Sequence, residues 1–234
     1  MLPEITVSER RLADSVVTLV APTRANGAAV ILAHGGTDDG RRIFQPAAVE
    51  LARAGYTVAL PATRMALHRD WALTQNSISR ATRVHRQALD LLAGQPLVDP
   101  IRLGFYGHSV GALQGAILLR EEPRVRAAVL AAFGTGSLRR FAVEDLAPCS
   151  GYLDELDRYD PGVSLGCPHR APVLLQFGEH DDSIRRDEAA ALSAAAVPPV
   201  ITRWYDCGHG VDADTAATRD RKTFFDTFLE VRAG

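Results

Sequence analysis

Three short segments of the sequence carry side chains that could cooperate in nucleophilic catalysis. The first is Gly107-His108-Ser109-Val110-Gly111, in which glycines stand two positions before and two positions after a serine. Glycines at these positions let the chain turn sharply from a strand into a helix, with the serine hydroxyl standing clear of the sheet. Read alone, the pattern also describes an ordinary tight turn, so its meaning depends on its neighbours and on partners elsewhere.

The second and third segments supply a base and an acid, which a serine hydroxyl needs because it is a weak nucleophile alone. His209, between two glycines, is the candidate base, although a lone histidine after a strand is often a surface group. Asp181 is the candidate acid, with Asp182 and Glu179 as alternatives, and the adjacent His180 is expected at the surface. The chain order serine, acid, histidine is typical of serine hydrolases built on an open α/β sheet.

A fourth segment, His34-Gly35-Gly36-Thr37, follows an apolar run and could stabilise a tetrahedral oxyanion, which requires backbone donors fixed in advance. We expect the Val110 N–H to supply one donor and the Gly36 N–H the other, with the Thr37 N–H as the alternative. An ordinary Gly-Gly turn is the competing interpretation. His34 itself is expected to be structural.

The surrounding sequence alternates between extended and helical patterns. Two β-branched runs at 5–8 and 16–20 predict a hairpin at a sheet edge. Continuous apolar runs predict buried strands at 28–33, 56–60, 101–106, 125–133, 173–177 and 201–205, and amphipathic or capped segments predict helices at 44–54, 71–93, 110–120, 187–196 and 215–231. Such alternation is typical of an α/β fold with a mostly parallel, twisted sheet of about eight strands and helices on both faces. The chemistry of these sheets lies at the carboxyl ends of their strands, where all four segments fall.

The chain length of 234 residues fits a single domain, 1–234. The only long stretch predicted to be irregular is 134–170, with a short helical pattern at 141–146. We interpret it as a connecting helix and a small cap within that domain.

These segments together resemble the α/β-hydrolase superfamily, and within it the dienelactone-hydrolase-like group, from about Ala28 to the C-terminal helix. The resemblance rests on His34-Gly35-Gly36, on the segments 107–111 and 172–181, and on Gly208-His209-Gly210. Dienelactone hydrolase itself uses a cysteine nucleophile where this chain has Ser109, so the resemblance implies a general serine esterase rather than a lactone-specific enzyme. An aspartate nucleophile, as in haloalkane dehalogenases, is likewise disfavoured.

Composition excludes several other classes. The net charge of −2 lacks the basic excess of a nucleic-acid-binding surface. No apolar run approaches the roughly 20 residues of a membrane span, and the first residues do not resemble a signal peptide. Three sparse cysteines favour a reducing compartment, so we expect a cytoplasmic protein without disulfides. No metal-ligand spacing or nucleotide-binding loop is present, so no metal or cofactor is expected.

The sequence therefore predicts a hydrolase that cleaves small or medium carboxylic esters through an acyl-enzyme, acting alone or as a homodimer. Arg64, after the strand at 56–60, could bind a substrate carboxylate, although a solvated arginine is the simpler interpretation. Two alternatives stay open. The same chemistry could serve a thioesterase, acyltransferase or cyclising enzyme, or the fold could be a binding module without catalysis.

Overall fold

The computed structural model describes residues 4–36 and 39–230 of the chain. Its strands are β1 (Ile5–Arg11), β2 (Val16–Pro22), β3 (Ala29–Ala33), β4 (Thr57–Pro61), β5 (Leu103–His108), β6 (Val125–Ala131), β7 (Val173–Gly178) and β8 (Val200–Tyr205). Its helices are α1 (Arg41–Arg53), α2 (Trp71–Ala93), α3 (Val110–Leu119), α4 (Ser137–Leu146), α5 (Ser150–Asp157), α6 (Pro161–Leu165), α7 (Arg186–Ala195) and α8 (Thr215–Phe228), with a 3₁₀ turn at Val211–Ala213.

The strands form one eight-stranded sheet in the order β1-β2-β4-β3-β5-β6-β7-β8. The pairs β1–β2 and β2–β4 are antiparallel, and every other neighbouring pair is parallel. The predicted edge hairpin and the mostly parallel sheet are therefore confirmed. The strand order reverses beside β3 and β5, so the loops after these two strands meet at one edge of the sheet.

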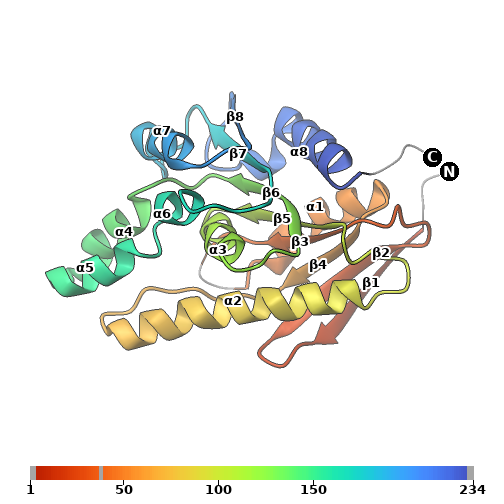
Figure 1. Cartoon of the computed structure of the whole chain (residues 1–234), viewed down its shortest axis with the longest axis horizontal. Coiled ribbons are helices and arrows are strands. Elements are labelled where there is room, and N and C mark those ends of the chain that lie inside the picture. Colours follow the sequence, from red (N-terminus) through yellow and green to blue (C-terminus); the bar gives the residue numbers. More distant parts are fainter. Residues whose placement is uncertain (1–3, 37–38, 231–234) are drawn as a thin grey trace.

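Helices cover both faces of this sheet (Figure 1). Within β3, Ile31 packs with α2 and α3 on one face, whereas Val30 and Leu32 pack with α1 and α8 on the other. Successive side chains of a strand point to opposite faces, so a strand covered on both sides must be apolar throughout. All five residues of β3 are accordingly buried.

The strand that leads to Ser109 differs from its predicted range. It was expected over 101–106, but β5 runs from Leu103 to His108. Ile101 lies outside it and is 71% exposed. Gly107 and His108 remain in the sheet because the parallel ladder to β6 continues through the pairs Gly107–Leu130 and His108–Ala131. The sheet therefore holds the chain rigid up to the residue before Ser109.

The segment 134–170 is more regular than its sequence suggests. It was predicted to be largely irregular, but it carries the three helices α4, α5 and α6, of which only α4 overlaps the expected helical pattern. Polar contacts tie it to the sheet domain: Arg140 Nε donates to Glu188 Oε1 over 2.7 Å, and the hydroxyls of Tyr152 and Thr74 lie 2.9 Å apart. Helices this short are marginally stable alone, so they depend on such tertiary contacts and leave only a weak pattern in the sequence.

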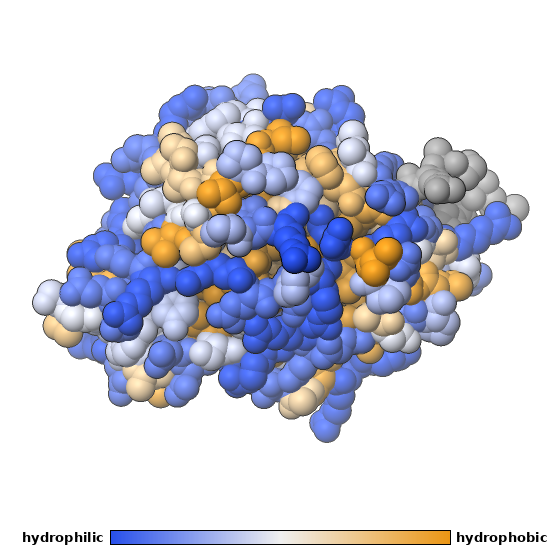
Figure 2. All heavy atoms as spheres, viewed as in Figure 1, coloured by the Kyte–Doolittle hydropathy of each residue, from blue (hydrophilic) through white to orange (hydrophobic). Residues whose placement is uncertain are grey.

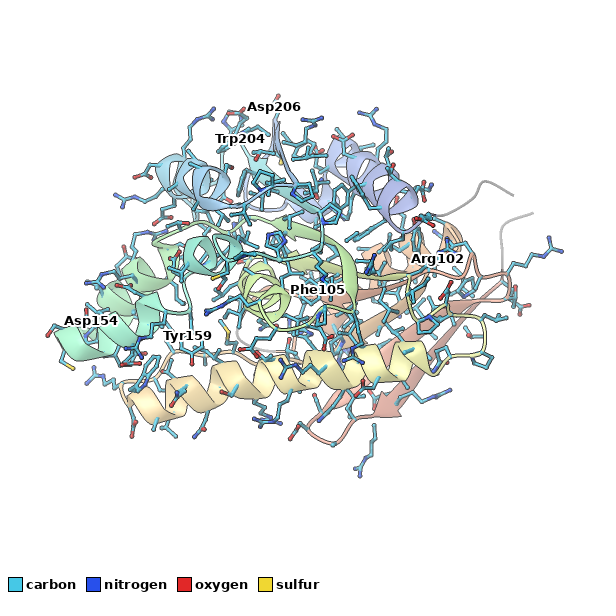
Figure 3. All side chains as sticks on the ribbon, viewed as in Figure 1. Arg102, Phe105, Asp154, Tyr159, Trp204 and Asp206 are labelled. Carbon is cyan, nitrogen blue, oxygen red and sulfur yellow. The ribbon has the colours of Figure 1, made fainter. Side chains whose placement is uncertain are left out.

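Side chains fill the space between the layers (Figure 3). Phe105 lies beneath α3, and Arg102 lies at the end of α8, where its Nε donates to the Leu229 carbonyl over 2.6 Å. The face shown in Figure 2 is mostly hydrophilic, with apolar residues in small separate groups. Across the described ranges, none of the helices is long and apolar enough to cross a membrane.

Candidate active site

Ser109 occupies a strained turn between β5 and α3. Its φ of 53° and ψ of −119° lie in a region that residues other than glycine rarely adopt. The surrounding backbone holds this conformation: the Ser109 N–H donates to the Ala131 carbonyl over 2.8 Å, and the Ser109 carbonyl accepts from Ala112 N over 2.9 Å. The serine side chain is thereby presented at the carboxyl end of β5, beside the first turn of a helix.

Both glycines of the Gly-x-Ser-x-Gly pattern are required by close backbone contacts. A Cβ on Gly107 would overlap the carbonyl of Gly111, and a Cβ on Gly111 would overlap the carbonyl of Ala33. The turn therefore packs against β3 at a distance that no larger residue allows. This contact also explains why the loop after β3 passes beside Ser109.

The structure brings the three candidate side chains together. His209 Nε2 lies 3.1 Å from Ser109 Oγ, and His209 Nδ1 lies 2.9 Å from Asp181 Oδ2 and 3.1 Å from Asp181 Oδ1. Asp181 follows β7 and His209 follows β8, so each side chain comes from the carboxyl end of a different parallel strand. The geometry allows a proton to pass from the serine hydroxyl to the imidazole while the carboxylate holds the other ring nitrogen.

Asp181 is set apart from the other candidate acids by its partners. Its Oδ1 accepts hydrogen bonds from the backbone amides of Ser183 and Ile184, over 2.8 and 2.9 Å. Burial opposes ionisation of this carboxyl, but the hydrogen bonds from His209 and the two amides outweigh burial and hold its pKa below the ordinary value. Asp181 is therefore an anion at neutral pH.

The two alternative acids and the adjacent histidine point elsewhere. Glu179 pairs with Arg186. The nearest partner of Asp182 is the hydroxyl of Ser183, 3.4 Å away. His180 is exposed and its Nε2 lies 2.8 Å from Asp206. Of the carboxylates in this loop, only Asp181 contacts His209 in the described part of the chain.

The two residues expected to supply the oxyanion donors belong to α3 and to the loop after β3. Val110 contributes the first amide of α3, and Gly36 adopts a φ of +77° in the loop after β3. A Cβ on Gly35 would come within 3.2 Å of the Ser109 Cβ, so this loop lies against the serine. Neither the Gly36 N–H nor the Val110 N–H has a protein acceptor among the described residues. Thr37, the alternative donor, lies outside those residues.

His34 begins this loop and is buried. Its Nδ1 donates to the Gly35 carbonyl over 3.0 Å, and its Nε2 accepts from Thr63 N over 3.4 Å. Burial lowers its pKa, with smaller opposing effects from the Gly35 carbonyl and Asp39. A neutral imidazole that bridges two loops fits the structural role expected for His34.

Buried polar groups that the sequence analysis did not identify lie beneath the His209 loop. Arg221 on α8 is only 3% exposed, and its guanidinium stacks on the Tyr106 ring, 3.9 Å from the centroid. Its Nε donates to Gln176 Oε1 over 3.2 Å, and another nitrogen lies 3.4 Å from the Val211 carbonyl. A single arginine among the apolar positions of α8 is the only sequence signal of this arrangement.

Arg64 is exposed after β4 and lines a surface hollow of about 390 Å³ together with Ser15 and Arg80. None of the three candidate catalytic side chains is among the described residues lining that hollow. A role for Arg64 in substrate binding thus stays a prediction.

All three cysteines are free, and burial, followed by nearby carboxylates, raises the pKa of Cys207.

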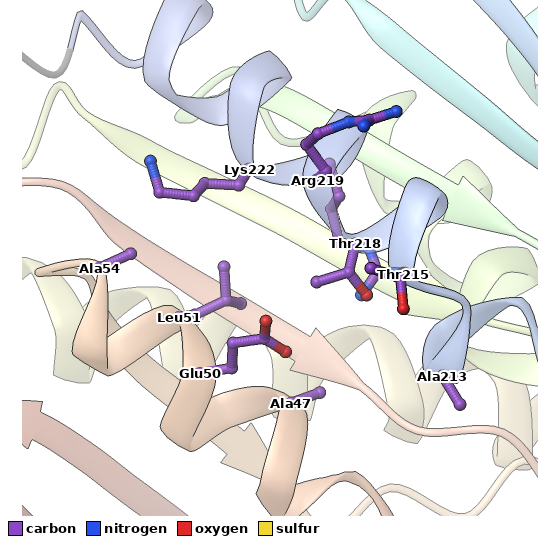
Figure 4. Close-up of a pocket in the computed structure, with 10 residues that line it drawn as sticks. Ala47, Glu50, Leu51, Ala54, Ala213, Thr215, Thr218, Arg219 and Lys222 are labelled. Atoms are coloured by element: carbon purple, nitrogen blue, oxygen red, sulfur yellow. The ribbon is translucent and has the colours of Figure 1, made fainter.

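A second hollow, of about 350 Å³, lies between α1 and α8. Figure 4 shows Glu50 and Leu51 on one wall and Thr218 and Lys222 on the other. Lys222 is already paired with Asp226 over 2.5 Å.

Throughout the described ranges, no group of three or more histidine, cysteine, aspartate or glutamate side chains could hold a metal ion.

Comparison with solved structures identifies the architecture. TT1662 from Thermus thermophilus superposes with a TM-score of 0.73 at 18% identity, over 98% of this chain and 100% of that one. Acetyl xylan esterase 1 from Thermoanaerobacterium sp. JW/SL YS485 superposes with a TM-score of 0.68 at 16% identity, over 99% of this chain and 89% of that one. The chain has the α/β-hydrolase fold.

A third solved structure, a prolyl endopeptidase, superposes with a TM-score of 0.74 at 18% identity over 99% of this chain. The present chain spans only 39% of that protein. No family model matches the sequence, and no curated protein matches it either. The likeness is therefore one of fold, and function has to be argued from the site.

Proposed function

We propose that this α/β hydrolase is a serine esterase that cleaves carboxylic esters through an acyl-enzyme. The observation that carries the proposal is the continuous hydrogen-bonded relay from Ser109 Oγ through His209 to Asp181. A binding module would place no demand on the alignment of these three groups, and Ser109 would not need a strained backbone.

Each side chain has a distinct task. Ser109 Oγ forms a bond to the ester carbonyl carbon while His209 Nε2 takes the hydroxyl proton, and the carbonyl π electrons move to the oxygen. The Gly36 and Val110 amides stabilise the resulting oxyanion; losing one such donor costs about 10²–10³ in kcat. Collapse of this intermediate breaks the bond to the leaving alkoxide, which receives the proton from His209.

Water then completes the reaction. His209 takes a proton from water as the water oxygen attacks the acyl carbon, and Ser109 leaves with that proton restored. Asp181 keeps the Nδ1–H of His209 oriented and stabilises the imidazolium that forms in each half. Every proton is thus returned, and the groups described above are sufficient for hydrolysis.

Esters are favoured over peptides by the relatives of similar size. This chain covers 89% of acetyl xylan esterase 1 and 96% of a cold-adapted esterase, but only 39% of the prolyl endopeptidase. The helices of 134–170 are short, so we propose small or medium acyl groups.

The test is a panel of p-nitrophenyl esters of graded chain length, with Ser109→Ala as the matched control and a prolyl p-nitroanilide as the peptide substrate. We expect short esters to be cleaved, and kcat to fall by a factor on the order of 10⁶ in the variant. A fluorophosphonate should label Ser109 in the native chain alone. Absence of both ester turnover and labelling would contradict the proposal, as would a preference for the anilide.

Acyl transfer shares every step up to the acyl-enzyme. The same panel run with added thiol and amine acceptors separates the two outcomes. Free acid as the dominant product supports an esterase, and a dominant thioester or amide would assign a transferase instead.

A further inference from the structure

A second histidine, His108, contacts the candidate base His209. His108 precedes Ser109 at the end of β5 and is only 6% exposed. Its Nε2 lies 2.8 Å from the backbone carbonyl oxygen of His209 and 3.4 Å from Asp212 Oδ1. Its ring makes a T-shaped contact with the His209 ring at 5.1 Å and a tilted contact with Phe44 at 5.4 Å.

These contacts fix the protonation of the His108 ring. A carbonyl oxygen only accepts hydrogen bonds, so Nε2 must carry a proton. Nδ1 is buried and has no partner among the described residues, and burial lowers the pKa of the ring against smaller opposing effects of Asp212 and the His209 carbonyl. The neutral form protonated at Nε2 satisfies the His209 carbonyl without placing a charge in a buried site.

The carbonyl of His209 is held from two sides. Val211 N donates to it over 2.9 Å from within the loop, and His108 donates from β5. Glycines at 208 and 210 leave the backbone on either side of His209 with wide rotational freedom. Hydrogen bonds from His180 and Arg221 also reach this loop, but they end on the carbonyls of Cys207 and Val211, two residues before and after His209. The bond from His108 is therefore the only direct tie, among the described residues, between the strand that carries Ser109 and the backbone of His209.

We propose that His108 is a positioning residue that sets the distance from His209 Nε2 to Ser109 Oγ. The inference rests on the proposed function. Because the nucleophile and its base are tied to one strand, their 3.1 Å separation is supported on the side of His209 that faces β5 as well as within its own loop. Displacement of a catalytic group by about 1 Å can cost on the order of 10²-fold in rate.

Two amide variants make a matched test. The side-chain nitrogen of glutamine in His108→Gln reaches about as far as Nε2, so it can donate to the His209 carbonyl. The shorter side chain in His108→Asn cannot reach it. We expect kcat for the best ester to fall about 10- to 100-fold in His108→Asn, with KM changed less than about threefold, and to recover to within about fivefold of native in His108→Gln. His85→Gln, a change at a buried histidine away from the site, should leave kcat unchanged.

A second readout needs no substrate. Long-range ¹H–¹⁵N correlation spectra of histidine-labelled protein report which ring nitrogen carries the proton. We expect His108 protonated at Nε2 and His209 protonated at Nδ1 in the native chain. In His108→Asn the His209 ring signals should shift and broaden, because the ring is no longer held in one position, whereas His108→Gln should keep the native signals.

The outcomes separate the two proposals. A native chain that neither cleaves esters nor reacts with a fluorophosphonate would end the esterase proposal, and the spectra would still decide whether His108 orders His209. An active native chain with equal kcat in the Asn and Gln variants would overturn the positioning role. So would His108 protonated at Nδ1 alone.

Discussion

The strained conformation of Ser109 is the clearest residue-level sign of function. A non-glycine residue at a φ of 53° costs about 1–3 kcal/mol, and here the ladder of β5 and the first turn of α3 hold it in place. In this conformation the hydroxyl lies within hydrogen-bonding distance of His209, and the following residue, Val110, begins α3. A purely structural turn at this point would be served better by glycine.

The assignment of Asp181 as the acid can be tested by removing its charge. Asp181→Asn keeps the shape of the side chain but removes the charge that orients His209, so kcat should fall by about 10⁴. Asp182→Asn, one residue further on, should change kcat by less than about twofold, because its carboxylate does not contact His209. Steady-state kinetics on a short ester check both variants. Equal losses at the two positions would mean that the acid is misassigned.

Among the elements, the contact between α3 and β3 decides whether the site can form. Gly111 is the second residue of α3 and lies against the Ala33 carbonyl. Gly151 is the second residue of α5, and an added Cβ there meets nothing within 4 Å. Two positions that are alike within their helices thus differ completely in their surroundings.

Replacing each glycine by alanine turns this difference into a measurement. Gly111→Ala should lower the free energy of unfolding by more than about 3 kcal/mol, because backbone must move to admit the methyl group. Gly151→Ala should raise it by up to about 1 kcal/mol, because alanine favours the helix. Urea denaturation at neutral pH reports both values. A tolerated Gly111→Ala would show that α3 does not pack on β3 as described.

For the whole molecule, buried neutral histidines link stability to pH. His85 is a buried residue of α2 whose Nε2 lies 2.7 Å from Gln114 Oε1 on α3, and burial lowers its pKa to about 4 from an ordinary 6.5. The unfolded chain therefore binds a proton at this side chain in a range where the folded chain does not. Stability from this site is complete above pH 6.5 and is lost as pH falls toward 4.

The loss assigned to His85 amounts to about 3 kcal/mol over that range. His85→Gln keeps a partner for Gln114 but cannot titrate. The difference in unfolding free energy between native chain and variant should therefore shrink by about 2–3 kcal/mol between pH 7 and pH 4. Denaturant titrations at several pH values check it. A difference independent of pH would contradict a buried, neutral His85.

The alternation of strands and helices could be predicted from the sequence because it depends on local periodicity and on glycines. The helix at 71–93 was predicted with its observed ends, and the strand-turn-helix around Ser109 was predicted from five residues. The range of β5 was not, because its last two residues are held by pairing with β6 rather than by their own preference. The helices in 134–170 were missed for a similar reason, since contacts such as that of Arg140 with Glu188 stabilise them.

The candidate site, like the fold, was predicted in part from the sequence and decided in part by tertiary contacts. Residue types, spacing and chain order selected Ser109, Asp181 and His209, because the chemistry restricts which side chains can serve. Only the tertiary structure separated Asp181 from its neighbours and brought His108 to the carbonyl of His209, 101 residues away. Sequence determines which side chains are available, but side-chain direction depends on packing between segments that are distant in the chain.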